Sequence, residues 1–163
     1  MITIAPLPRD RTEEVLHLEL GPGQGAFVHP IADMVTEATP GVAFHVIRDG
    51  DLAVGFFKTD CGYCERHDFA PKGAPGLRGF LIGFQYQGRG YGRAAMRALP
   101  AYLRRLLPDA EAVYLTVNCA NPVARHAYVS GGWEDTGTLY HGGSSGPQAV
   151  LRLALGVQVA AAT

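Results

Sequence analysis

Residues 87–92 read Gln87-Gly88-Arg89-Gly90-Tyr91-Gly92, and this glycine-rich stretch decides the fold of the chain. The apolar run 80–84 precedes it and the helix-forming segment 93–99 follows at once, so we predict strand, loop and helix in that order. The first amides of a helix have no intrahelical partner and lie at the positive end of the helix dipole. Glycines let an anion approach these amides without meeting a Cβ atom. The stretch therefore predicts a phosphate site, with positive charge from Arg89 and Arg93 beside it.

Two common phosphate loops do not fit this stretch. A Walker loop needs Gly-Lys-Ser/Thr after its glycines, and no such triplet occurs in the chain. The dinucleotide fingerprint G-x-G-x-x-G would start at Gly88, but its last position is Arg93, and the loop falls past the middle of the chain. A glycine-rich turn that only caps a helix remains an alternative, and the rest of the chain must decide.

A second constellation follows the next predicted strand. Asn121, Ala124, Tyr128, Gly132 and Trp133 are spaced as Asn-x-x-Ala-x-x-x-Tyr-x-x-x-Gly-aromatic, and Ala124 and Tyr128 share one face of a short helix. This pattern resembles the second signature of the GNAT N-acetyltransferase superfamily. Residues 87–92 match the superfamily's Gln/Arg-x-x-Gly-x-Gly/Ala pyrophosphate loop at every specified position. The resemblance covers about residues 44–155, and segments 24–38 and 79–88 resemble the spermine/spermidine acetyltransferase-like branch.

Composition places the chain among globular proteins, with 163 residues, 47% of them hydrophobic and 18% charged. We expect one acetyltransferase-like domain over residues 1–163, with a core at about 44–155 and a tail at 156–163. The net charge of -1 gives no reason to expect nucleic acid. We see no secretory leader and no apolar run near the ~18 residues that span a membrane, and three cysteines suit a reducing compartment, so we expect a cytoplasmic protein without a membrane partner. The apolar tail suits packing on a second copy, so a homodimer is one expectation.

The order of elements predicts an α/β fold of the mixed α+β kind, with a central mixed sheet and helices on both faces. Asp49-Gly50 predicts a hairpin turn, and Pro100 should kink or split the helix around it. Asn121 and Pro122 suit the N-cap and the first position of a helix. The predicted strands are 2–5, 44–47, 52–57, 77–84, 112–118, 133–140 and 148–155. One predicted helix starts at Asp10, and three others span 31–38, 93–106 and 123–130.

The resemblance implies that acetyl-CoA is the co-substrate and binds where two parallel strands, 77–84 and 112–118, splay apart. Their unpaired backbone groups would bind pantetheine like an added strand. The N–H of Ile82, or of its neighbours Gly83 and Phe84, would hydrogen-bond the thioester oxygen. The pyrophosphate would bind at Gln87 and the amides of Gly88, Arg89, Gly90, Tyr91, Gly92 and Arg93, and Asn121 would contact pantetheine.

The same resemblance implies transfer of an acetyl group to a primary amine of a small molecule, by direct attack in a ternary complex. Tyr128 is the candidate donor to the leaving thiolate, because a phenol is a neutral donor at pH 7. Packing under the sheet is the alternative role for Tyr128. No Asp or Glu occurs between Leu77 and Gly92, where several relatives carry an acid that helps to deprotonate the amine, and Gly83 stands where we would look for one. A non-catalytic sensor that binds acyl-CoA therefore remains an alternative.

Residues facing the acceptor are less well marked. Asp33 and Glu37 are four apart on the predicted helix 31–38 and would attract a cationic amine, although such a pair is more often a solvated helix face. His29, His45 and His141 are candidate bases.

Cys61-x-x-Cys64-x-x-His67 looks like part of a metal site. A structural zinc site needs four ligands, and only Asp60, Glu65 or Asp68 would complete the set locally. We therefore expect no metal and a polar loop that borders the acceptor pocket. A metal or redox module is the third alternative.

Overall fold

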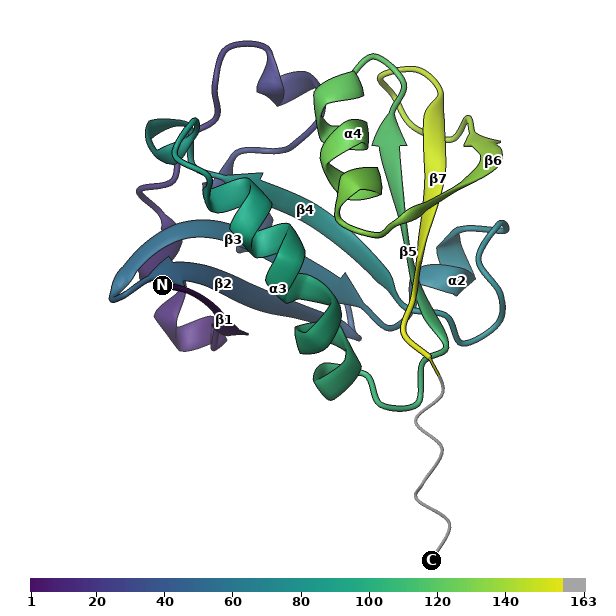
Figure 1. Ribbon diagram of the computed structural model, residues 1–163, viewed down its shortest axis with the longest axis horizontal. Coiled ribbons are helices and arrows are strands. Elements are labelled where there is room, and N and C mark those ends of the chain that lie inside the picture. The colour runs from purple at the N-terminus through teal and green to yellow at the C-terminus, as the bar shows by residue number, and fades with distance from the viewer. Residues whose placement is uncertain (157–163) are drawn as a thin grey trace, which may run out of the picture.

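The computed structural model describes residues 1–156, and its centre is a sheet of seven strands in the order β1-β2-β3-β4-β5-β7-β6 (Figure 1). The strands are β1 (Ile2–Pro6), β2 (Val42–Asp49), β3 (Leu52–Asp60), β4 (Gly76–Ile82), β5 (Ala112–Asn118), β6 (Glu134–Tyr140) and β7 (Gln148–Ala154). The α-helices are α1 (Ile31–Met34), α2 (Tyr63–Arg66), α3 (Tyr91–Leu106) and α4 (Pro122–Ser130), and the 3-10 helices are η1 (Arg9–Val15), η2 (Gln24–Ala26) and η3 (Phe84–Tyr86). This arrangement confirms the predicted fold class.

Strands β4 and β5 are parallel and separate along their length. Gly76 and Tyr114, near the amino-terminal ends of the two strands, are the one pair in register between them among residues 1–156. The other neighbouring strands pair antiparallel. Figure 1 shows β4 and β5 diverging from this point toward their carboxyl ends, with α4 beside the gap. The predicted splay is confirmed, and it leaves backbone groups of both strands without a partner strand.

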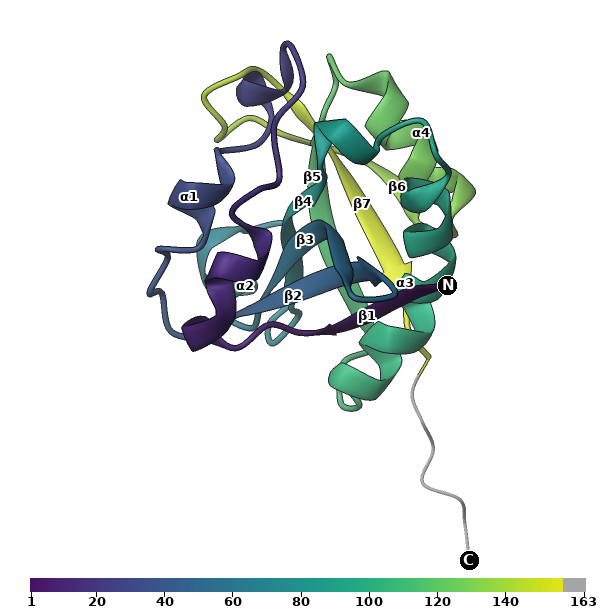
Figure 2. The same cartoon turned by 90° about the vertical axis from the view of Figure 1, so that its left-hand side faces the viewer.

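Helices cover both faces of the sheet, as Figure 2 shows. Because side chains alternate along a strand, Ile47 of β2 packs in the cluster under α3 and α4, while Phe44 and Val46 pack on the opposite face. The opposite face is closed by η1 and α1, which bury Val15 and Met34. The apolar residues of each strand thus fix which helix lies on which side.

Three predicted elements differ in the structure. Helix α1 ends at Met34, not at Ala38, because the Thr36 hydroxyl donates to the Asp33 carbonyl (2.7 Å) and takes it out of the helix ladder. The helix expected from Asp10 is the 3-10 helix η1, interrupted at Arg11. Residues 61–76 are not loop alone, because they form α2 and pack Tyr63 against β5 and β7.

One further boundary was wrong, and the helix around Pro100 is not split. Strand β4 ends at Ile82, and the turn η3 follows because the Tyr86 N–H donates to the Gly83 carbonyl (2.8 Å). Helix α3 is continuous through Pro100, although proline removes one hydrogen bond at a cost of about 3 kcal/mol. The helix buries five side chains against the sheet. Burial of each of the larger ones stabilises the fold by roughly 1.5–3 kcal/mol, and together they outweigh the cost of the proline. They are Ala95, Met96, Leu99, Tyr102 and Leu103.

Within residues 1–156, no helix combines the length and the apolar character that a membrane span requires. The predicted tail, residues 157–163, lies outside the described residues.

Candidate active site

The glycine-rich loop presents a row of free amides at the start of α3. Gly88 and Gly90 have φ of 77° and 84°, in the left-handed region, and Gly90 is the N-cap of the helix. The first amide of this region with a main-chain acceptor is that of Ala94, which donates to the Gly90 carbonyl (3.0 Å). Within residues 1–156, none of the amides from Gly88 to Arg93 has such an acceptor. Six donors at the positive end of a sixteen-residue helix form an anion site.

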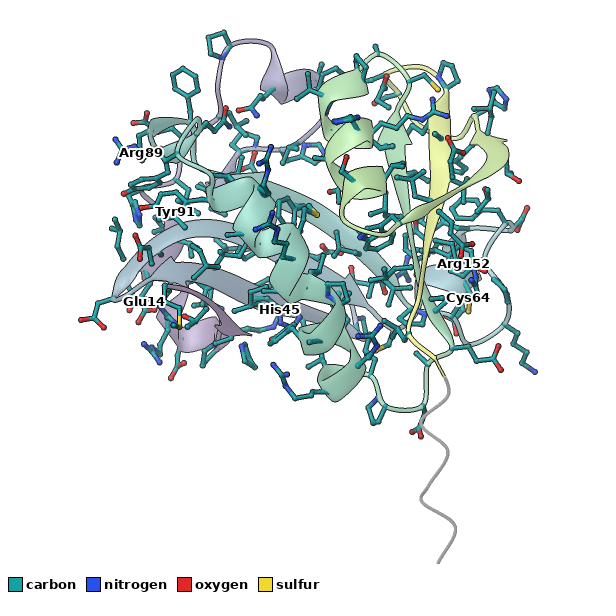
Figure 3. The ribbon with its side chains drawn as sticks, in the orientation of Figure 1. Glu14, His45, Cys64, Arg89, Tyr91 and Arg152 are labelled. Carbon is teal, nitrogen blue, oxygen red and sulfur yellow. The ribbon has the colours of Figure 1, made fainter. Side chains whose placement is uncertain are left out.

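Two side chains hold this loop in place. The Gln87 side-chain amide donates to the main-chain carbonyl of Ile82 (3.0 Å) and to the side-chain oxygen Oε1 of Gln24 (3.3 Å). The Tyr91 hydroxyl donates to Asp49 Oδ2 (2.7 Å), so the hairpin between β2 and β3 is tied to the first residue of α3. Figure 3 shows Arg89 and Tyr91 beside each other, with Arg89 at the outer edge of the loop. The loop is therefore anchored on both sides of its glycines.

A cavity of about 380 Å³ opens beside these amides, between the end of β4, the start of α3 and α4. We call it the loop cavity. Its lining includes Ile82, Gln87, Gly88, Tyr91, Gly92, Asn121 and Tyr128 from the residues predicted by sequence. Gly83, Phe84, Arg89, Gly90 and Arg93 do not line it. Phe84 lies in η3, and its amide donates to the Glu19 carbonyl (2.8 Å).

The amide of Ile82 faces the gap between β4 and β5. The next amide, of Gly83, donates to the Val54 carbonyl of β3 (2.9 Å), and successive amides of a strand point to opposite sides. The Ile82 N–H therefore points away from β3, toward β5. A Cβ atom at Gly83 would lie 2.9 Å from both Leu18 and the Gln85 side chain. A side chain at the position where an acid was sought would therefore have to displace the ends of these two side chains.

A second cavity, of about 400 Å³, follows the gap between β4 and β5. We call it the strand cavity. Phe27, Val28, Phe80, Asn121, Ala124 and Tyr128 line both it and the loop cavity, so the two meet at these residues. Asn121 is also the N-cap of α4, with its side-chain oxygen accepting from the Ala124 amide (3.3 Å). The predicted cap is therefore confirmed, and the Asn121 side chain stands at the junction of the cavities.

Tyr128 lies at this junction and is 9% exposed. Its ring makes edge contacts with Phe80 and Trp133, at centroid distances of 6.1 and 5.7 Å. Burial raises the pKa of its hydroxyl well above the usual value for tyrosine. The phenol therefore keeps its proton at neutral pH and can act as a hydrogen-bond donor toward the junction.

The two predicted substrate acids lie in a third cavity, of about 500 Å³, which we call the outer cavity. Asp33 lies on its exposed rim. Glu37 is bound by Lys58 Nζ (2.7 Å) and by the Arg78 guanidinium (2.7 and 2.9 Å). Partial burial raises the pKa of Glu37, but the bonds from Lys58 and Arg78 outweigh it and lower the pKa overall. The carboxylate is thus already neutralised by two cations.

The three candidate histidines are dispersed. His45 is fully buried between the sheet and α3, as Figure 3 shows, with its ring nitrogens 2.6 Å from the Tyr102 hydroxyl and 2.9 Å from the Thr59 hydroxyl. It lines none of the three cavities, so the hypothesis that it is a base is wrong. His29 is exposed and lines the strand and outer cavities, whereas His141 lines neither.

His45 predicts how stability depends on pH. Burial lowers its pKa from 6.5 to about 4, so the unfolded chain binds a proton between these values and the folded chain does not. Its contribution is therefore fully present above pH 6.5 and is lost as the pH falls toward 4. Between pH 7.5 and 5, we expect this group to reduce the free energy of unfolding by about 2 kcal/mol. Urea unfolding at both pH values measures the loss, and His45→Gln should abolish that part of it, whereas His29→Asn should not.

The cysteine-containing loop brings no metal ligands together. No group of three His, Cys, Asp or Glu side chains within residues 1–156 could hold a metal ion. Cys64 Sγ accepts from the Gly73 amide (3.2 Å), and Figure 3 places Cys64 by α2, far from Arg89 at the glycine loop. The loop instead contributes Tyr63 and His67 to the strand cavity. Sequence reasoning missed Tyr63, Arg78 and Tyr140, because no motif marks them, and it considered His67 only as a candidate metal ligand.

Comparisons with known proteins agree with this geometry. The model of the acetyltransferase (GNAT) family matches residues 13–132. An uncharacterized N-acetyltransferase, YbbJ of Bacillus subtilis, is 32% identical over 97 residues, which are 56% of this chain and 58% of that protein. The match thus spans little more than half of that relative.

Two solved structures share the fold at low sequence identity. A chimera of spermidine N-acetyltransferase SpeG from Vibrio cholerae and hSSAT has a TM-score of 0.70 at 18% identity, over 94% of this chain and 95% of that one. Aminoglycoside acetyltransferase AAC(6')-Ib, in complex with coenzyme A and kanamycin, has a TM-score of 0.73 at 15% identity, over 94% and 95%. With the family match over residues 13–132 and the splayed strands beside a free-amide loop, the chain belongs to the acetyltransferase (GNAT) family.

Proposed function

We propose that the protein transfers an acetyl group from acetyl-CoA to a primary amine of a small molecule, by direct attack while both are bound. One observation carries the proposal: a loop of six free amides borders a cavity, which Gly88, Tyr91 and Gly92 line and which meets a second cavity at a buried tyrosine. The first cavity fits a diphosphate-bearing co-substrate, and the second fits an acceptor. Tyr128 stands where the two would meet.

Acetyl-CoA supplies the activated acetyl group, and the backbone supplies most of its binding. The amides of Gly88 to Arg93 are free to hold the diphosphate, with Arg89 and Arg93 adding positive charge. Open backbone groups of β4 and β5 bind the pantetheine arm as a strand would. The Ile82 amide, directed away from β3, donates to the thioester oxygen as negative charge develops there.

Two protons must be placed. The amine nitrogen forms a bond to the acetyl carbon as the carbon–sulfur bond breaks, and the sulfur leaves with the electron pair. The Tyr128 hydroxyl donates a hydrogen bond or its proton to that sulfur. The amine attacks in its neutral form, and water in the strand cavity takes its proton, since no Asp or Glu of the described residues lines that cavity.

A non-catalytic acyl-CoA sensor is the second candidate, favoured by the absence of Asp and Glu between Leu77 and Gly92. Calorimetry with coenzyme A and acetyl-CoA, followed by a thiol-release assay with a panel of amines, separates the candidates. We expect micromolar binding of both and amine-dependent release of thiol. Binding without release from any amine would support the sensor, and no binding of either compound would overturn both candidates.

A further inference from the structure

The strand cavity has an unusual balance of charge for a site that receives an amine. No Asp or Glu lines it among the described residues. Its one lysine or arginine is Arg78, and two histidines, His29 and His67, accompany it. The rest of its polar lining is neutral, with hydroxyl and amide groups such as those of Thr116, Asn118 and Gln148.

The acids nearest to this cavity are already engaged. Glu37 is bound by Lys58 and Arg78. Asp60 is fully buried and bound by Arg66 and by the Gly62 amide (2.9 Å), with Arg78 Nε 3.6 Å from its carboxylate. The ion pairs of this cluster join the three cations Lys58, Arg66 and Arg78 to these two carboxylates, and Glu65 also acts on Arg66 without lining the cavity. Asp33 lies only on the solvent-exposed rim of the outer cavity, so Arg78 is the charged group that the strand cavity itself presents.

One group of the cavity remains able to bind an anion. Arg78 gives one edge of its guanidinium to Glu37, but its side chain is still 30% exposed. His67 Nδ1 lies 3.0 Å from the Tyr63 carbonyl, which can only accept, so Nδ1 carries a proton and Nε2 of the neutral ring is an acceptor for a donor of the ligand or for water. The His67 ring is held in this orientation by stacking on Tyr63 at 3.9 Å.

We propose that the acceptor is a small amine that also carries a carboxylate, with the carboxylate directed to the Arg78 end of the strand cavity and the amine toward Tyr128. The inference rests on the proposed function and names the acceptor class. A polycation such as a polyamine would lose its hydration on entering this cavity, and its charges would be repelled by Arg78 with no lining carboxylate to offset them. A zwitterion instead places its negative group there and leaves its amine beside the junction.

Matched acceptors test the proposal. Titrations of the coenzyme A-loaded protein would compare L-phenylalanine with phenethylamine, and β-alanine with ethylamine, since the two members of each pair differ by a carboxylate. We expect the carboxylate-bearing member to bind at least about tenfold more tightly, which is 1.4 kcal/mol. Spermidine and kanamycin should bind more weakly than either amino acid. The same order is expected for kcat/KM in the thiol-release assay.

Two variants should change this preference. Arg78→Gln removes a cation and frees Glu37, so the ratio of affinities within each pair should fall about tenfold. Because Arg78 belongs to an ion-pair cluster, the exposed residue Ser144, which also lines the cavity, offers a second variant outside that cluster. Ser144→Asp adds a carboxylate and should lower the ratio of affinities within each pair. Ser144→Asn adds a side chain of nearly the same size as Asp but without charge, and it should leave this ratio unchanged.

The outcomes separate this proposal from the proposed function. Equal or tighter binding of the decarboxylated amines, or of spermidine, would overturn the acceptor class while leaving acetyl transfer intact. Ratios that neither variant moves would also overturn it. A carboxylate preference in binding without release of thiol would support the acceptor class and overturn catalysis.

Discussion

Replacing Tyr128 by phenylalanine should lower kcat for acetyl transfer by about 10²-fold or more, the usual size of a lost general acid. The phenylalanine ring keeps the edge contacts with Phe80 and Trp133 and removes only the hydroxyl at the junction of the cavities. Because the amides of Gly88 to Arg93 are unchanged, the affinity for coenzyme A should stay within about twofold. Steady-state thiol release and calorimetry measure the two quantities on the same sample.

Tyr102→Phe is the matched control for this loss. It removes the same hydroxyl from a tyrosine that bonds His45 and lines none of the three cavities. We expect lower thermal stability and an unchanged kcat below the melting temperature. If Tyr128→Phe retained most of the kcat, Tyr128 would be a packing residue and another group would have to protonate the sulfur.

A negative charge at Gly92 should weaken coenzyme A binding by about 10²-fold. Gly92 is the second residue of α3 and lines the loop cavity, and an added Cβ atom there would meet only Ile82, at an ordinary 3.8 Å. Gly92→Glu is therefore accommodated, but its carboxylate would repel the diphosphate by about 3 kcal/mol at 5 Å and an effective dielectric constant near 20. Calorimetric titration with coenzyme A measures the loss.

The thermal stability of the Gly92→Glu variant should rise, although its affinity for coenzyme A falls. An acid in the first turn interacts favourably with the helix dipole, and replacing glycine in a helix is worth roughly 0.5–1 kcal/mol. Gly92→Gln is the control, with similar size and no charge, and it should keep most of the affinity. Equal losses from glutamate and glutamine would indicate a steric effect and argue against an anion at these amides.

The sequence predicted those features that short stretches determine. The glycine loop, the cap at Asn121 and the hairpin at Asp49-Gly50 each depend on a few neighbouring residues, and the structure has all three. The possible split at Pro100 does not occur, because the stability of this helix comes from packing against strands distant in sequence. The end of α1 was mispredicted, because one hydroxyl of Thr36 redirects a carbonyl.

The acceptor side could not be predicted in the same way. The charge of the strand cavity depends on Glu37, Lys58, Asp60, Arg66 and Arg78, which come together from separate segments. In the sequence, Glu37 looked like a free acid, and only the fold shows its two cationic partners. Likewise, the spacing of Cys61, Cys64 and His67 drew attention to a metal, while the contribution of this loop to the cavity is aromatic.

Phe27 and Val28 line the loop, strand and outer cavities alike. A ligand that favours one arrangement of the Phe27 and Val28 side chains in its own cavity therefore also changes the lining of the other two cavities. Thermodynamic linkage then makes the effect reciprocal, so that co-substrate and acceptor alter each other's affinity by the same factor. Cooperativity between the two substrates would thus arise from a shared wall, in addition to their contact at the reacting atoms.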